Sequence, residues 1–199
     1  MDFYLGIDIG TSRVKAVLFD EHFQARASAA ENTGPRLSAN GYAEQDMAQL
    51  WQSVIAILRQ IAQCPELQGG RLRAIGLAGQ GEGVWLSDAE GEPVGPGILW
   101  SDTRSRELMS VLLRRPDFDR RFFAETGTHL QPCNTSMQLC WLRHYQPERL
   151  AAARYLFFAK DWSRFRLTGV AALDITDAST SLLNQQSGEL SAVVLNEMG

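Results

Sequence analysis

The sequence predicts an α/β fold in which a mixed sheet is flanked by helices. Two short apolar runs, 3–9 and 14–19, lie on either side of a Gly-Thr-Ser turn and indicate two strands joined in a hairpin. Residues 46–62 carry apolar side chains at spacings of three and four, which is typical of an amphipathic helix. Another strand is predicted at 72–77, so helices alternate with the strands of one sheet.

The other elements follow from the same patterns. Residues 23–30 alternate loosely and predict a third antiparallel strand. Residues 31–45 are rich in Gly, Asn, Pro and Ser and predict a loop, after which Asp46 is expected to cap the helix. Short strands are expected at 84–86, 98–100 and 155–158, and helices at 103–113, 118–125, 136–144, 148–153 and 161–167.

Length and composition limit the classes of function. The 199 residues, 45% apolar and 21% charged, suit one domain or two small ones. A net charge of −4 argues against nucleic acid or an anionic membrane as partner, since both require clustered basic charge. The chain has no apolar run long enough to span a bilayer and no signal-peptide pattern. Three cysteines without C-x-x-C spacing suit reduced thiols, so we expect a cytoplasmic protein.

The first candidate site is the turn between the first two strands, residues 8–15, here called the phosphate hairpin. Gly10 permits a tight turn, and Thr11 and Ser12 add hydroxyls to turn amides that can surround an anion. Asp8 would repel a phosphate unless Mg²⁺ with its waters lay between them, and Lys15 supplies a compensating charge. The pattern predicts a nucleotide-phosphate site, and an ordinary hairpin is the alternative.

The second candidate is Gly79-Gln80-Gly81-Glu82-Gly83, here called the glycine loop, directly after strand 72–77. In open α/β sheets, ligands gather at the carboxyl ends of strands. The amide of Gln80 and the carboxylate of Glu82 suit the hydroxyls of a sugar or polyol, which both donate and accept hydrogen bonds. The alternative is a strained glycine loop with two solvated polar side chains.

The third candidate is Trp100-Ser101-Asp102-Thr103-Arg104, here called the tryptophan loop. Trp100 offers an apolar face to a carbohydrate and Asp102 a carboxylate to its hydroxyls. The simpler alternative is that Asp102 or Ser101 caps the following helix. Arg104 is expected to hold the loop rather than to contact substrate.

Other polar residues stay open between a ligand role and a structural one. Asp161 is a good helix N-cap, and Asn134 suits a ligand contact or a loop equally. Lys160 suits a role in the site or a plain surface position. The cluster of Asp174, Thr176, Asp177 and Ser179 is expected to form structural turns.

Taken in order, these segments resemble the FGGY family of carbohydrate kinases, which has the ribonuclease H-like, actin-like ATPase fold. The resemblance runs from the first strand to about Asn184. Its most specific parts are Gly6-Ile7-Asp8-Ile9-Gly10-Thr11-Ser12, Gly41-Tyr42-Ala43-Glu44-Gln45-Asp46, Ile75-Gly76-Leu77-Ala78-Gly79-Gln80, Leu99-Trp100-Ser101-Asp102-Thr103-Arg104 and Lys160-Asp161-Trp162.

The resemblance implies ATP and Mg²⁺ as cofactors, with Asp8 near Mg²⁺ and Lys15 near phosphate. It implies that Gly81 and Glu82 contact a sugar or polyol, with Trp100 and Asp102 around the same cleft. Gly81 stands where glycerol kinases have an arginine, and Gly81-Glu82 where xylulokinases have Met-His. The pattern is closer to erythritol kinases and L-xylulose kinases.

Family members are more than twice as long as this chain, so we expect residues 1–199 to be a truncated N-terminal domain without its C-terminal domain. The catalytic base, an aspartate in a Gly-Asp segment, is then expected beyond Gly199, and the chain alone is expected to be inactive. A homodimer of the full-length protein is also considered. The alternative from another class is a non-kinase binding or regulatory module of the actin-like ATPase fold, which would share the hairpin without a polyol cleft. A third is a domain without ligand affinity.

Overall fold

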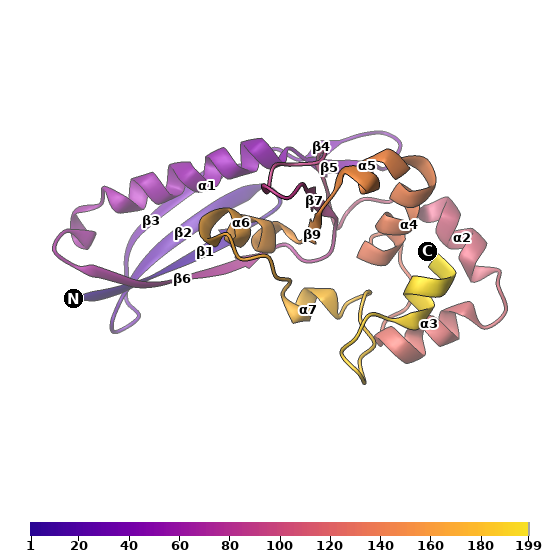
Figure 1. Ribbon diagram of the computed structural model, residues 1–199. Coiled ribbons are helices and arrows are strands. Elements are labelled where there is room, and N and C mark those ends of the chain that lie inside the picture. Colours follow the sequence, from indigo (N-terminus) through magenta and orange to yellow (C-terminus); the bar gives the residue numbers. More distant parts are fainter. Residues whose placement is uncertain (199) are drawn as a thin grey trace.

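A four-stranded sheet in the order β3-β2-β1-β6 is the scaffold of the computed structural model, which describes residues 1–198 (Figure 1). The first three strands, β1 (Asp2–Ile9), β2 (Arg13–Asp20) and β3 (Ala25–Asn32), pair antiparallel as predicted. β6 (Arg71–Gly79) pairs parallel with β1 and forms the edge. The end of β1 and the end of β6 therefore lie side by side.

One face of this sheet is buried under α1 (Met47–Ala62), which lies along the sheet in Figure 1. Alternate residues of β1 point to that face and are buried, as the period of two along a strand requires. The apolar stripe of α1 packs on them. Asp46 caps the helix as predicted, since its Oδ1 accepts a hydrogen bond from the Gln49 amide at 3.0 Å.

The opposite face of the sheet is lined by small residues. Gly6, Gly76 and Ala78 border a hollow of about 510 Å³, with Asp8 and Lys15 at its rim. A Cβ built on Gly76 would meet no atom within 4 Å. The phosphate hairpin therefore presents its carboxylate and ammonium beside open space.

Two smaller sheets stand at the end of the main one. β4 (Arg36–Leu37), β5 (Ala43–Gln45) and β8 (Gly97–Ile98) form the first, and β7 (Trp85–Ser87) pairs with β9 (Tyr155–Phe157) in the second. The prediction of a loop over 31–45 was wrong here, because β3 extends to Asn32 and both β4 and β5 lie in that stretch. β5 exists through its pairing with β8, and local composition carries no signal of a partner so distant in sequence.

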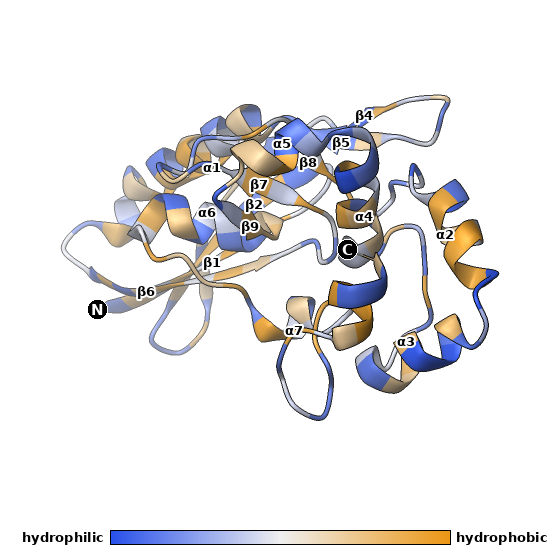
Figure 2. Cartoon of the chain, turned by 45° about the vertical axis from the view of Figure 1, so that its right-hand side comes forward, coloured by the Kyte–Doolittle hydropathy of each residue, from blue (hydrophilic) through white to orange (hydrophobic). Residues whose placement is uncertain are grey.

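The helices after β8 divide between two apolar cores (Figure 1). The first three of them contribute Leu112, Phe122 and Met137 to a second core beside the end of the main sheet, whereas Ala159 and Trp162 of a later helix belong to the main core with α1. Hydrophobic residues recur along α2 and α4 in Figure 2. These elements are α2 (Arg106–Leu113), α3 (Phe118–Thr126), α4 (Thr135–Tyr145), α5 (Pro147–Ala152), α6 (Ala159–Thr168) and α7 (Ile175–Ala178), with short helical turns η1 (Pro65–Leu67) and η2 (Val194–Met198). Within residues 1–198, the helices are all too short or too polar to cross a membrane.

Two helix caps that the sequence offered as alternatives are not formed. α2 begins after Ser105, so neither Asp102 nor Ser101 caps it. α6 begins after Phe158, which places Asp161 inside the first turn, where its Oδ2 accepts a hydrogen bond from the Asp174 amide at 3.2 Å. The carboxylates of Asp102 and Asp161 instead accept hydrogen bonds from backbone amides of other segments, at Ala43 and Asp174. Asp174 does cap α7, in agreement with its predicted structural role.

We expect Asp46→Ala to lower the free energy of unfolding by about 1 kcal/mol, because the Gln49 amide loses its acceptor. Asp46→Asn is the matched control. It keeps a capping oxygen but loses the exposed ion pair with Arg36, and should cost a few tenths of a kcal/mol at most. Urea unfolding followed by circular dichroism measures both. Equal losses in the two variants would contradict the capping role.

Candidate functional site

A ring of hydrogen bonds joins the phosphate hairpin to the glycine loop. Thr11 Oγ1 donates to Gln80 Oε1 at 2.8 Å, and Gln80 Nε2 donates to Gln45 Oε1 at 3.0 Å. Gln45, which is buried, closes the ring by donating its Nε2 to the Thr11 carbonyl at 3.3 Å. Trp100 joins from the tryptophan loop, since its Nε1 donates to Thr11 Oγ1 at 3.0 Å. All three predicted candidates thus meet at one edge of the sheet.

The tip of the phosphate hairpin is a tight turn. The Gly10 amide donates to the Arg13 carbonyl at 3.1 Å, and a Cβ on Gly10 would lie 2.7 Å from that oxygen, so a side chain has no room. Ser12 is exposed. Asp8 and Lys15 are direct partners in the β1–β2 register and both are exposed. Because paired residues share a face of the sheet, their charges flank one patch of surface.

Glu82 is held at the N-terminus of α4. Its Oε1 accepts a hydrogen bond from Asn134 Nδ2 at 3.0 Å, and its Oε2 accepts from the amide and the hydroxyl of Thr135 at 2.8 and 2.9 Å. The positive end of the helix dipole favours a carboxylate there. Glu82 has φ of 54°, a conformation uncommon for residues with a side chain and concentrated at functional sites. A carboxylate accepts about four hydrogen bonds, so acceptor capacity remains for a ligand.

The Glu82 cavity, of about 440 Å³, opens beside this carboxylate. Its walls come from the glycine loop, from the segment 126–134 before α4, and from 179–185 after α7. Asn134 also lines the cavity, although its side-chain amide already donates a hydrogen bond to Glu82. Amide, hydroxyl and carboxylate groups, which can bind the hydroxyls of a ligand, line this cavity together.

Gly81 is packed against a second carboxylate. A Cβ on Gly81 would lie 2.8 Å from Asp177 Oδ1. Lys160 Nζ pairs with Asp177 and lies 3.7 Å from Asp174 Oδ2. Of the two alternatives for Lys160, the plain surface position is excluded, because its side chain is only 11% exposed. No local pattern signals this pairing, because the two residues lie 17 positions apart.

Asp102 turns away from the cleft. It is fully buried, and its Oδ2 accepts from the Ala43 amide at 2.6 Å and from Arg104 Nη2 at 2.8 Å. Its Oδ1 accepts from the amide and the Nε of Arg104 at 2.8 and 2.9 Å. The expectation that Asp102 binds substrate hydroxyls is therefore corrected, because both oxygens are enclosed by protein donors. Trp100, in contrast, is 51% exposed beside the ring of hydrogen bonds.

Arg104 holds the tryptophan loop, as predicted. Its Nη2 also donates to Glu44 Oε1 at 2.7 Å, and its guanidinium carbon lies 4.2 Å from the ring centroid of Tyr42. Burial acts to lower the pKa of Arg104, but hydrogen bonds to Asp102 and Glu44 outweigh it and raise that pKa. The arginine is thus a permanent cation between two carboxylates.

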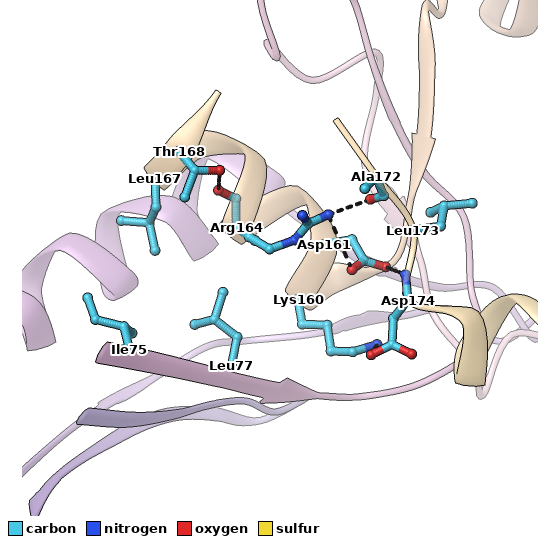
Figure 3. A pocket seen from close by; sticks show the side chains of 10 residues that line it. All are labelled: Ile75, Leu77, Lys160, Asp161, Arg164, Leu167, Thr168, Ala172, Leu173 and Asp174. Atoms are coloured by element: carbon cyan, nitrogen blue, oxygen red, sulfur yellow. Dashed lines mark hydrogen bonds and ion pairs between the residues drawn. The ribbon is translucent and has the colours of Figure 1, made fainter. Parts of the chain in front are cut away.

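A larger cavity, about 610 Å³, lies between β6 and α6 (Figure 3). Ile75 and Leu77 form an apolar floor, and Lys160, Asp161 and Arg164 point in from α6. Arg164 Nη2 donates to the Ala172 carbonyl at 2.6 Å. No residue of the phosphate hairpin, the glycine loop or the tryptophan loop lines this cavity.

Residues 3–199 match the family model described as the FGGY family of carbohydrate kinases, N-terminal domain. The chain belongs to this family. It is 35% identical over all of its length to erythritol kinase from Brucella abortus, and 33% identical over 95% of its length to a probable L-xylulose kinase from Pasteurella multocida. The crystal structure of a xyloylose kinase from Brucella ovis superposes with a TM-score of 0.89 at 33% identity, over 99% of this chain.

These FGGY relatives confirm the predicted family and its actin-like ATPase fold. The chain spans about two fifths of their length: 38% of the erythritol kinase, 39% of the L-xylulose kinase and 40% of the crystallised chain. FGGY kinases use ATP, so the family also supports the predicted cofactor class. Among residues 1–198, no three or more His, Cys, Asp and Glu side chains gather as a metal site.

We expect Asp102→Asn to lower the free energy of unfolding by about 3 kcal/mol, because it leaves the buried Arg104 without its main charge partner. Asp117→Asn is the matched control. It removes an exposed pair with Arg120, at 3.4 Å, and should change stability by less than about 0.5 kcal/mol. Chemical unfolding of both variants measures these changes in the free energy of unfolding. A loss at Asp102 no larger than at Asp117 would show that Asp102 is not a structural anchor.

Proposed function

We propose that this chain is the N-terminal, substrate-side domain of an ATP-dependent kinase that phosphorylates a hydroxyl of a sugar or polyol. The observation that carries the proposal is the ring formed by Thr11, Gln80 and Gln45. It fixes a phosphate-type hairpin beside a loop that carries hydroxyl-binding side chains. Phosphoryl transfer depends on that relative position more than on covalent chemistry.

At the phosphate end, Asp8 is assigned to hold Mg²⁺ through water, and Lys15 to approach the phosphate. The residues suit these ligands: the Asp8 carboxylate makes no hydrogen bond or ion pair with any other described residue and stands exposed next to the hollow by Gly6 and Gly76. The amides of Thr11 and Ser12 and the hydroxyl of Ser12 complete the anion site, since the Gly10 amide and the Thr11 hydroxyl already donate to Arg13 and Gln80. When bound, Mg²⁺ neutralises the charge of the transferred phosphoryl group.

At the substrate end, Glu82 and Gln80 are assigned to accept and donate hydrogen bonds to substrate hydroxyls. Gly81 adds no side chain at this point, and the exposed indole of Trp100 provides an apolar wall. Asp102 is a positioning residue in this proposal, since it fixes Arg104 and the Ala43 amide. The base that removes the hydroxyl proton is assigned to an aspartate outside these 199 residues, as is the adenine-binding part of the enzyme.

Erythritol and L-xylulose, named in two of the relatives, are the first candidate substrates. Glycine at position 81 supports them, as does the loop pattern that predicted this group. We further propose a cytoplasmic enzyme, because the three cysteines are free thiols. A homodimer of the full-length protein stays a prediction.

A non-kinase binding module of the same fold is the second hypothesis, and it predicts no affinity for polyols. Titration calorimetry of the chain with erythritol separates the two, with Glu82→Ala as the variant that should lose binding. Saturation-transfer NMR extends the same measurement to millimolar affinities. No binding of erythritol or of L-xylulose by the unmodified chain would favour the second hypothesis.

We expect Asp8→Asn to reduce kcat by about a hundredfold or more in the protein expressed from the complete reading frame that encodes this chain. The carboxylate that holds Mg²⁺ is lost, while the polyol site at Glu82 is untouched. Glu21→Gln, an exposed carboxylate just past β2, is the matched control. A coupled assay for ADP measures turnover. Full activity of Asp8→Asn would overturn the role assigned to Asp8.

A further inference from the structure

The Glu82 cavity is lined by neutral hydrogen-bonding groups and a single carboxylate. Gln131, Thr180 and Gln185 contribute amides and a hydroxyl to its wall. Among the described residues that line it, none is lysine, arginine or histidine. Hydroxyls of a ligand can donate to and accept from such groups, whereas an anionic ligand finds no positive charge there.

The thiol of Cys133, which also lines this cavity, lies in a negative electrostatic environment. Burial raises the pKa of Cys133, and the negative charge of Glu82 raises it further. The thiol therefore stays neutral and adds no charge of its own. The net charge of the lining is that of the carboxylate, whose two oxygens are fixed by Asn134 and Thr135.

The ammonium of Lys160, behind the glycine loop, is already paired with carboxylates. Lys160 pairs with Asp177 and lies within 4 Å of Asp174, so two carboxylates surround one ammonium. Asp177 also faces the loop, because a Cβ on Gly81 would lie 2.8 Å from its Oδ1. A carboxylate thus occupies the space toward which a side chain at position 81 would project.

From these charges we infer that the site selects uncharged polyols and sugars and excludes sugar acids and sugar phosphates. The inference rests on the proposed function and narrows its substrate class. An anionic group on the substrate would face the Glu82 carboxylate, and none of the described residues that line the cavity supplies a compensating cation. Like charges a few ångströms apart near a protein surface repel strongly enough to cost at least about tenfold in affinity.

The test compares kcat/KM for neutral and acidic substrates of similar size, with the protein from the complete reading frame, ATP and Mg²⁺. Erythritol and L-xylulose are the neutral probes, and erythronate and gluconate the acidic ones. Neutral substrates should exceed the acids at least tenfold. Acids used as well as or better than neutral substrates would overturn the inference and leave the kinase proposal standing. Phosphorylation of neither class would overturn the proposed function itself.

A charge placed in the cavity gives a second test. Gln131 is exposed at the rim, so Gln131→Arg should fold, which circular dichroism verifies. The variant should raise the ratio of acid to neutral kcat/KM about tenfold, because it supplies the missing cation. Gln131→Glu, the matched control of opposite sign, should not raise that ratio. An unchanged ratio in a folded Gln131→Arg variant would overturn charge as the basis of the selection.

Discussion

Parallel pairing of β6 with β1 is the constraint on which the site depends. The register sets Ile9 opposite Gly79, and the Gln80 amide continues it by donating to the Ile9 carbonyl at 3.0 Å. The phosphate hairpin and the glycine loop therefore leave the sheet at the same edge. Thr11 and Gln80 then lie within hydrogen-bond reach, although 69 residues separate them in sequence. A shift of one residue would turn each side chain of β6 to the other face and break this contact.

Behind that edge, a buried cluster of charges fixes the tryptophan loop. Arg104 lies between Asp102 and Glu44, with the faces of Tyr42 and Trp141 on the guanidinium. Burying such charges costs solvation, so the pair is weak evidence for net stability. Its structural effect is specific: it ties β5 to the loop that carries Trp100, and so sets where the indole meets Thr11.

The two ends of the site differ in charge. At the hairpin, a lysine and a carboxylate stand exposed and open, which suits a metal-bound polyphosphate. At the glycine loop, carboxylates predominate, and the nearby lysine and arginine are each paired with acidic groups. This separation supports an anionic nucleotide at one end and an uncharged hydroxyl compound at the other.

The sequence by itself determined the elements that depend on local signals. Two short apolar runs on either side of a turn predicted β1 and β2, and the spacing of apolar residues with Asp46 predicted α1. The family motifs located the three loops. Tertiary structure alone decided what their carboxylates do. A carboxylate ahead of a helix suits a cap, a ligand or an ion pair equally, and for Asp102 the choice is made by the Ala43 amide, 59 residues away. The hydrogen bonds of Gln45 and the Lys160–Asp177 pair were not predicted for the same reason, since only tertiary packing brings these partners together.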